Sequence, residues 1–361
     1  MIKRILALSG ISIAVAMAQA PNPAAAKPKP AASAKPAANA KPSNYTPPKT
    51  PWGEPDLQGM WPLNHLIAVG LQRPARLGDK ANLTDEEVAA AQAAADQRLA
   101  RAKSGAIPVA DASSKVMKQT SLIVDPPNGQ FPELTDFGKG LQSDMKSSYR
   151  PGQTVFDNVD DFAAWDRCIT RGMPVSMEPR NYNNGIKIVQ SPGYVVVFTE
   201  MAHEARIIPT TAAMPKLDPT IKQYLGEPRG HWEGNTLVVE SNNFNGLVGQ
   251  TSAGVPGSPG PLQPETTNFK VTERFTRTAP DTIEFSMKVE DPQVMKSSYT
   301  VAYPMYLDNS YEFYEYACHE GNTAVRNYIE TSRYEREHPS PLPQPAPAKA
   351  KPAGPKPAPA K

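Results

Sequence analysis

The sequence predicts a mainly β protein, an antiparallel β-barrel or sandwich with peripheral helices and disordered tails. From Gly185 onward, apolar and polar residues alternate, so that one face of each short segment is apolar. Tight turns such as Ser191-Pro192-Gly193 separate these segments, whereas both ends of the chain consist almost entirely of Pro, Ala and Lys. Short alternating strands joined by tight turns are typical of antiparallel sheets.

Residues 1–18 have the pattern of a secretory signal peptide. Lys3 and Arg4 precede the apolar run from Ile5 to Val15, and small residues follow as far as Ala18. We expect cleavage after Ala18 and a periplasmic or secreted protein. An uncleaved membrane anchor is the alternative, but the run is shorter than the roughly 20 residues that span a bilayer.

Residues 19–50 and 339–361 are expected to be disordered, because Pro, Ala and Lys bury too little surface to offset the entropy of ordering. A single β-rich domain is therefore predicted over 51–338. The ends hold 11 of the 38 basic residues, and all 36 acidic residues lie between Glu54 and Glu337, so the domain has a net charge of about −9. This charge argues against nucleic-acid binding. The basic tails are spacers or, alternatively, contact anionic envelope polymers or a membrane surface.

Helices are expected mainly in the N-terminal part of the domain, over 80–165. A short strand between Trp52 and Trp61 comes first, and Pro62 ends it. Thr84 and Glu87 then form a capping box at the start of a helix that continues to about residue 103. Its apolar stripe is almost all alanine, so this helix should lie on the surface. Two more short helices are predicted, over Thr135–Tyr149 and Val159–Trp165.

The strands are expected over 185–318, where the hydrophobic period is two. They are Ile186–Gln190, Tyr194–Met201, Ala205–Ile208, Gly230–Trp232, Thr236–Glu240, Phe269–Thr276, Ile283–Glu290, the segment around Tyr299, Val301 and Tyr303, and Tyr311–Cys318. Residues 186–201 and 230–240 should each form a hairpin. A closing helix over 323–337 should pack Val325, Tyr328 and Ile329 on the sheet.

The two cysteines, Cys168 and Cys318, are predicted to form a disulfide. An even pair in an exported protein usually ends as a disulfide, and this one would close a loop of about 150 residues. A metal ligand or a nucleophile is the alternative use of these thiols. Neither has support, since the chain contains no C-x-x-C and no C-x-x-C-H.

Four blocks of the sequence together resemble a family of exported bacterial proteins of uncharacterised function. The resemblance covers nearly all of the chain between the tails and implies a bacterial envelope protein, but it supplies no catalytic residues. Gly59-Met60-Trp61 also resembles the start of lipocalin-like barrels, in which a late arginine stacks on the tryptophan. Arg326 or Arg333 is the expected partner, although Pro62 breaks the strand where lipocalins continue. The four blocks are 52–61 (WGEPDLQGMW), 167–174 (RCITRGMP), 230–239 (GHWEGNTLVV) and 314–322 (YEYACHEGN).

Four clusters of polar residues are candidates for catalysis. An imidazole suits proton transfer near neutral pH, and a carboxylate on an apolar face has a raised pKa unless a cation meets it. The alternative for each histidine is a structural role, and for Glu273 a bulge that turns the side chain outward. The clusters are His203-Glu204 with Arg206, Arg229 with His231, His319-Glu320 beside Cys318, and Glu273 on the apolar face of its strand.

A metal site is a further hypothesis. His203, His231 and His319 with one glutamate would suit zinc or iron, but no H-E-x-x-H or H-x-H spacing supports such a set. The chain also lacks a nucleophile elbow, a P-loop and a dinucleotide fingerprint. We therefore predict neither a metal nor a cofactor.

Two function hypotheses follow. The first is a cofactor-free enzyme in which these histidines and Glu204, Glu273 or Glu320 act on a small organic molecule by acid–base catalysis. The second is a non-catalytic envelope protein that binds a small apolar or sugar-like ligand or serves as a scaffold, with Arg206, Arg229, Tyr314 and Tyr316 as candidate ligand-binding residues. Two or more histidines that converge on one pocket would favour the enzyme, whereas an aromatic, uncharged cavity would favour the binding protein.

Overall fold

The computed structural model describes residues 45–104, 116–248, 250–251, 255, 257–260 and 262–339. The predicted signal peptide and almost all of the predicted tails lie outside these residues. Backbone contacts begin slightly before residue 51, because Asp56 N donates to Pro48 O at 2.8 Å. Among the described residues, no helix is long and apolar enough to cross a membrane.

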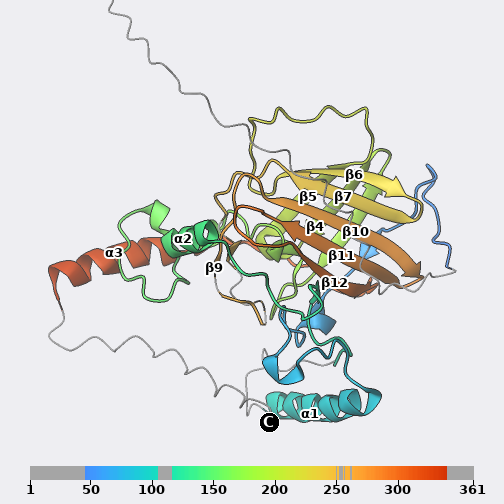
Figure 1. Cartoon of the computed structure of the whole chain (residues 1–361), viewed down its shortest axis with the longest axis horizontal. Coiled ribbons are helices and arrows are strands. Elements are labelled where there is room, and N and C mark those ends of the chain that lie inside the picture. The colour runs from blue at the N-terminus through green and yellow to red at the C-terminus, as the bar shows by residue number, and fades with distance from the viewer. Residues whose placement is uncertain are drawn as a thin grey trace, which may run out of the picture. The chain divides into compact units, whose positions relative to one another are not determined.

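Two antiparallel sheets are the main regular elements of the fold, which is mainly β as predicted (Figure 1). The smaller sheet has the order β1 (Gly59–Met60), β3 (Ile186–Ser191), β4 (Tyr194–Thr199) and β5 (Glu204–Pro209). The larger has the order β2 (Ile123–Asp125), β12 (Tyr299–Tyr306), β11 (Thr282–Glu290), β10 (Lys270–Ala279), β7 (Thr236–Asn242) and β6 (Glu227–Glu233). A separate short pair joins β8 (Gln250–Thr251) to β9 (Leu262–Gln263).

One hydrophobic core joins the inner faces of the two sheets. Alternation places Phe275 and Phe285 from the larger sheet and Val195 and Val197 from the smaller sheet in this core. β5 and β6 are edge strands, and no hydrogen-bonded ladder joins them in the described part of the chain. The arrangement therefore fits the predicted sandwich; a closed barrel is not formed by these strand pairs.

The predicted hairpins are confirmed. β3 and β4 pair from Ile186↔Thr199 to Ser191↔Tyr194, and Gly193 in their turn has a φ of +79°. β6 and β7 close on Glu233↔Thr236, where Gly234 has a φ of +60°. Only glycine adopts such left-handed angles without strain, which is why these turns could be read from the sequence.

The first helix, α1 (Asp85–Lys103), begins at the predicted capping box. Glu87 N donates to Thr84 Oγ1 at 3.2 Å, and Thr84 N donates to Glu87 Oε2 at 2.8 Å. No described side chain of this helix is fully buried. The alanine stripe thus forms a surface helix, as expected from its small buried area.

Two predicted helices are shorter in the structure. α2 spans Asp136–Asp144, because Met145 takes an extended backbone. A Cβ at Gly138 would lie 2.3 Å from Val294 O, so the glycine permits close packing of this helix on the loop before β12. Instead of a helix over 159–165, the chain forms one 3-10 turn, Val159–Asp161, which Asn158 caps at its start and which ends because Phe162 takes an extended backbone.

The predicted strand Tyr311–Cys318 is wrong, because this segment is irregular and pairs with no strand among the described residues. A buried carboxylate, that of Glu200, holds it instead. Tyr314 N donates to Glu200 Oε1 at 3.2 Å, and the Tyr311 hydroxyl donates to Glu200 Oε2 at 2.6 Å. These hydrogen bonds hold the aromatic segment to the end of β4 without making it part of a sheet.

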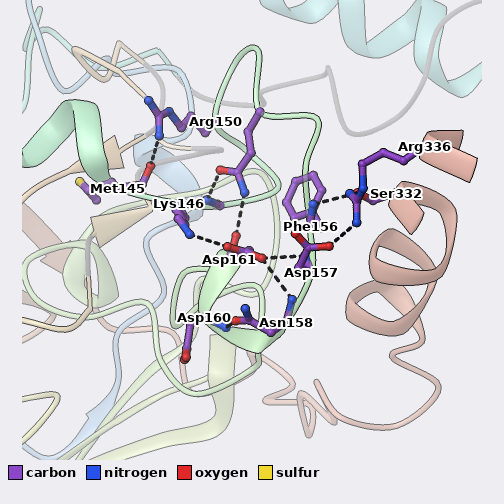
Figure 2. Close-up of polar contacts among 12 residues, drawn as sticks. Met145, Lys146, Arg150, Phe156, Asp157, Asn158, Asp160, Asp161, Ser332 and Arg336 are labelled. Atoms are coloured by element: carbon purple, nitrogen blue, oxygen red, sulfur yellow. Dashed lines mark hydrogen bonds and ion pairs between the residues drawn. The ribbon is translucent and has the colours of Figure 1, made fainter. Parts of the chain in front are cut away.

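The closing helix, α3 (Ala324–Glu337), was predicted to pack on the sheet, but it packs on a loop instead (Figure 1). The Tyr328 ring lies 5.0 Å from the Phe156 ring and 6.1 Å from the Phe162 ring. Figure 2 shows the polar side of this contact, where Arg336 pairs with Asp157 and Phe156 N donates to Ser332 Oγ at 2.9 Å. The helix is thereby fixed against residues 156–162.

Asp161 organises the loop that receives α3 (Figure 2). Its carboxylate accepts hydrogen bonds from Asp157 N at 2.7 Å and Asn158 N at 3.1 Å, and from Lys146 Nζ at 2.6 Å. These donors, with Lys146 first, hold the pKa of Asp161 below its usual value. An ionised carboxylate therefore holds together the loop on which the helix packs.

Candidate functional site

A cavity of about 480 Å³ lies where residues 148–149, 162–168, 183 and 315–328 meet. The segment around Cys168, the segment around Cys318 and the start of α3 each supply part of the wall. The Cys168–Cys318 disulfide is present and joins the first two segments, as predicted. The lining residues are Ser148, Tyr149, Phe162, Trp165, Asp166, Cys168, Asn183, Glu315, Tyr316, Ala317, Cys318, Asn322, Ala324, Val325 and Tyr328, and we refer to this space as the aromatic cavity.

Trp165 and Tyr316 form one wall of the aromatic cavity. Their rings stack with 6.1 Å between centroids and 30° between planes. Burial, together with the neighbouring Tyr182, raises the pKa of Tyr316 to about 12, so its hydroxyl is neutral at physiological pH. The wall is therefore aromatic and uncharged.

Asp166 shapes the turn that carries Trp165. Its Oδ2 accepts hydrogen bonds from Ser147 Oγ at 2.7 Å and from Ala163 N at 2.8 Å, while Ser148 Oγ donates to Oδ1 at 2.5 Å. A carboxylate with several donors is well satisfied by the protein itself. Asp166 thus positions the cavity wall and has little accepting capacity left for a ligand.

Arg171 connects the aromatic cavity to the protein interior. Its guanidinium carbon lies 4.5 Å from the centroid of the Trp165 ring, within cation–π range. The side chain is buried, and Nη1 lies 3.4 Å from Met201 Sδ. Burial lowers the pKa of Arg171, whereas nearby Tyr149, Tyr182 and Glu178 oppose this effect.

Behind Arg171 the interior contains a set of charged residues that we call the buried charge cluster. Arg206 and Glu273 make a two-pronged ion pair: Arg206 Nη1 donates to Glu273 Oε1 at 2.8 Å, and Nη2 also reaches Oε2. Their side chains are 2% and 0% exposed. Ser176 Oγ donates to Glu204 Oε2 at 2.9 Å. The cluster consists of Arg171, Glu178, Arg180, Glu204, Arg206 and Glu273, coupled through the charges of neighbouring members.

Glu178 is a buried carboxyl of the cluster with an unsatisfied oxygen. It is 1% exposed, and its Oε2 has no hydrogen-bond partner in the described structure. Burial raises the pKa of Glu178 to about 7, even though Arg180 and Arg171 favour the charged form. Tyr299 and Tyr303 also face it, and burial raises the pKa of both phenols.

The Glu178 carboxyl should make stability depend on pH. Its pKa is 4.5 ordinarily and about 7 in the folded protein, so the folded state binds the proton more tightly. The resulting stabilisation, about 3 kcal/mol, is complete below pH 4.5 and is lost as pH rises through 7. Between pH 4.5 and pH 8 we therefore expect wild type to lose about 3 kcal/mol of unfolding free energy relative to Glu178→Gln, as measured by urea denaturation. Glu335→Gln on exposed α3 is the control, and a parallel response of both variants would contradict the expectation.

The structure does not bring the predicted histidines together at a cavity. His203, His231 and His319 are exposed, and no described histidine lines the aromatic cavity. His231 Nε2 lies 3.3 Å from Glu233 Oε1, so its partner is this glutamate and not the predicted Arg229. His203 sits in a turn with a φ of +54°, but its neighbour Glu204 turns inward to Ser176. His319-Glu320 occupies an exposed turn after Cys318.

Other predicted residues do come together. Glu204, Arg206 and Glu273 belong to the buried charge cluster, and the cation that meets Glu273 is Arg206. Glu273 lies on the apolar face of β10, so no bulge turns it outward. Of the two predicted tyrosines, Tyr316 lines the aromatic cavity, whereas Tyr314 is 61% exposed.

Arg229 lies elsewhere, at a second cavity of about 360 Å³ between β5 and β6 that Arg206 also lines. Its guanidinium is occupied by protein acceptors. Nε donates to Glu227 Oε1 at 2.9 Å, and Nη1 donates to Met214 O at 3.1 Å. Arg229 therefore ties the 214–215 loop to β6.

Sequence reasoning missed most of the residues at the cavity and in the cluster. The sequence predicts Trp165 as the last residue of a helix, and it assigns no role to Asp166, Arg171, Glu178 or Arg180. A signal was present, because residues 171–180 place three charged side chains among buried Met and Val residues. Charged residues within an apolar segment often mark a buried polar network.

The arginine over Trp61 is also not one of the two predicted. The Arg277 guanidinium carbon lies 5.8 Å from the Trp61 ring centroid, and Arg277 Nη1 donates to Asp56 O at 2.8 Å. Arg326 pairs with Glu330 within α3, and Arg333 donates to Asp157 O at 2.6 Å. Trp61 is thus covered by β10 and not by the closing helix.

Fold and site together define a mainly β protein with two antiparallel sheets and a disulfide-bordered aromatic cavity. No family model matches the chain, and neither a curated protein nor a solved structure does. Within the described ranges, no three His, Cys, Asp or Glu side chains are grouped so that they could hold a metal ion. The disulfide is typical of proteins outside the reducing cytoplasm.

Proposed function

We propose that this chain is an exported bacterial envelope protein that binds a small organic molecule in the aromatic cavity without converting it. The aromatic cavity is the observation that carries the proposal. Its volume of about 480 Å³ lies within the range of small-molecule sites. Aromatic side chains supply large contact area at low entropic cost, which suits ligand binding.

The walls of the cavity are held before any ligand arrives. The disulfide fixes the first two segments to each other, Asp166 fixes the turn beneath Trp165, and the Arg336–Asp157 pair fixes α3. A preformed site avoids the entropic cost of ordering loops on binding. Export is supported by the predicted signal peptide and by the disulfide.

The alternative is a cofactor-free acid–base enzyme that uses His203, His231 or His319. These rings are exposed, and the carboxylates of Glu204 and Glu273 are engaged by Ser176 and Arg206. A general base must lie within hydrogen-bond reach of a bound substrate. The absence of a histidine among the described lining residues therefore favours binding over catalysis.

Tyr316→Ala tests the proposal against Tyr314→Ala, a matched change two residues away that does not line the cavity. The probe is the neutral dye N-phenyl-1-naphthylamine, followed by fluorescence, with native mass spectrometry of small molecules that copurify with the oxidised protein. We expect the Tyr316 variant to lose at least about tenfold in dye affinity, since one aromatic contact is worth about 1 kcal/mol beyond its buried area. The Tyr314 variant should bind as wild type does.

Equal dye affinity in the two variants would contradict the proposal. An envelope metabolite extract provides the test of the alternative. If wild type consumed a metabolite and the His203→Ala, His231→Ala, His319→Ala triple variant did not, the enzyme would replace the binding protein as the better description.

A further inference from the structure

The charges around the aromatic cavity restrict its ligand. Asp166 and Glu315 are the charged side chains among the described lining residues, and no lysine or arginine lines the space. An anionic ligand would thus meet two carboxylates and no cation. Coulomb repulsion in a partly enclosed site disfavours phosphate, sulfate and carboxylate ligands.

A cationic ligand is disfavoured by the residue behind the wall. The Trp165 ring would be the best platform for a cation, but the guanidinium of Arg171 already lies 4.5 Å from its centroid. Arg171 is buried, so its charge is weakly screened by solvent. Asp166, the nearest carboxylate on that turn, already accepts three close hydrogen bonds from the protein. The cavity is thus suited to a neutral molecule.

The polar lining residues make a fully apolar ligand a poor fit. Glu315 is exposed at the cavity, and its carboxylate accepts no hydrogen bond from any residue that the structure describes. Such a carboxylate accepts from two adjacent hydroxyl groups at once. The Tyr316 hydroxyl is neutral and can both donate and accept. A ligand with hydroxyls on its edge would satisfy these groups.

We infer that the ligand of the aromatic cavity is a neutral carbohydrate, with a pyranose ring against Tyr316 and a pair of adjacent hydroxyls on Glu315. The ring C–H bonds of a pyranose carry partial positive charge and lie favourably on the negative face of an aromatic ring. The cavity volume of about 480 Å³ accommodates one or two sugar rings. This inference rests on the proposed function, since it names the ligand class of the same site.

A charge series of sugars with the same ring tests the inference. Methyl glucoside and N-acetylglucosamine are neutral, glucosamine is cationic and glucuronic acid is anionic; the galacto counterparts repeat the series. Binding to the oxidised, full-length protein is measured by saturation-transfer NMR and by displacement of N-phenyl-1-naphthylamine. We expect a neutral sugar to bind at least about tenfold more tightly than its charged counterparts.

Two substitutions identify the site of any sugar binding. Glu315→Gln should weaken binding of the neutral sugar several-fold and should change dye affinity by a smaller factor, because the dye has no hydroxyls to pair with the carboxylate. Glu320→Gln, an exposed glutamate that does not line the cavity, is the matched control and should have no effect.

Four results would overturn the inference. A preference for glucosamine would indicate an amine ligand, and a preference for glucuronic acid an anionic one. Dye binding that depends on Tyr316, without binding of any sugar, would overturn the carbohydrate and leave the proposed function standing. If wild type bound neither the dye nor any sugar, the proposed function would be overturned as well.

Discussion

Replacing Arg206 alone by methionine is expected to lower the free energy of unfolding by about 3–5 kcal/mol. The change leaves the carboxylate of Glu273, which is 0% exposed, without its ion-pair partner in the core. Removing one partner of a buried pair costs far more than the pair contributes, because the remaining charge has lost its hydration and has no cation to replace it. Urea denaturation of the oxidised protein measures the loss.

The double variant Arg206→Met, Glu273→Met should recover most of that loss. Apolar residues of similar volume often replace a buried ion pair at little cost, since both desolvation penalties disappear together. Arg274→Met is the matched control. Arg274 follows Glu273 on β10, and it pairs with Glu233 at 2.7 Å on the exposed face of the strand. We expect it to cost less than about 1 kcal/mol. Equal losses in Arg206→Met and Arg274→Met would contradict the argument.

The sheets could be predicted from the sequence because their signals are local. In β10 and β11 every second residue is buried, so the period of two was visible in each strand alone. Gly193 and Gly234 marked the hairpin turns by their need for positive φ. The same alternation puts Glu273 on the apolar face of its strand, although it gives no indication of the cation that pairs with it. Local patterns of this kind do not depend on which strands become neighbours.

The site could not be predicted in the same way, because distant contacts decide it. Tyr311–Cys318 has strand-like composition, yet Glu200 at the end of β4 takes the backbone N–H of Tyr314 that a neighbouring strand would have used. Asp166 likewise sets the turn below Trp165 through donors 3 to 19 residues away. Nothing in the local pattern of either segment indicates these acceptors.

The disulfide was the one distant contact that could be predicted, since only two cysteines are present. It brings residues 168 and 318 to the same cavity, where Tyr316 meets Trp165. It does not bring the candidate histidines to the cavity, because His319 lies in an exposed turn after Cys318. The link therefore assembles aromatic side chains rather than imidazoles.

Removing the disulfide should have the largest effect on the protein. The Cys168→Ser, Cys318→Ser double variant opens a loop that spans 150 residues, and the freedom gained by the unfolded chain corresponds to about 4–5 kcal/mol. The variant should also lose dye binding, because the Trp165 and Tyr316 segments are then no longer joined. Urea denaturation and dye titration under conditions where the variant stays folded measure the two effects separately.

The same experiment separates two roles of the link. Wild type treated with dithiothreitol should behave like the double variant in both measurements, since it contains the same open loop. Tyr316→Ala should lose dye affinity but keep most of its stability, because it retains the disulfide. If the double variant were less stable yet bound the dye as wild type does, the disulfide would stabilise the fold without assembling the cavity. The walls would then be held by Asp166 and the Arg336–Asp157 pair alone.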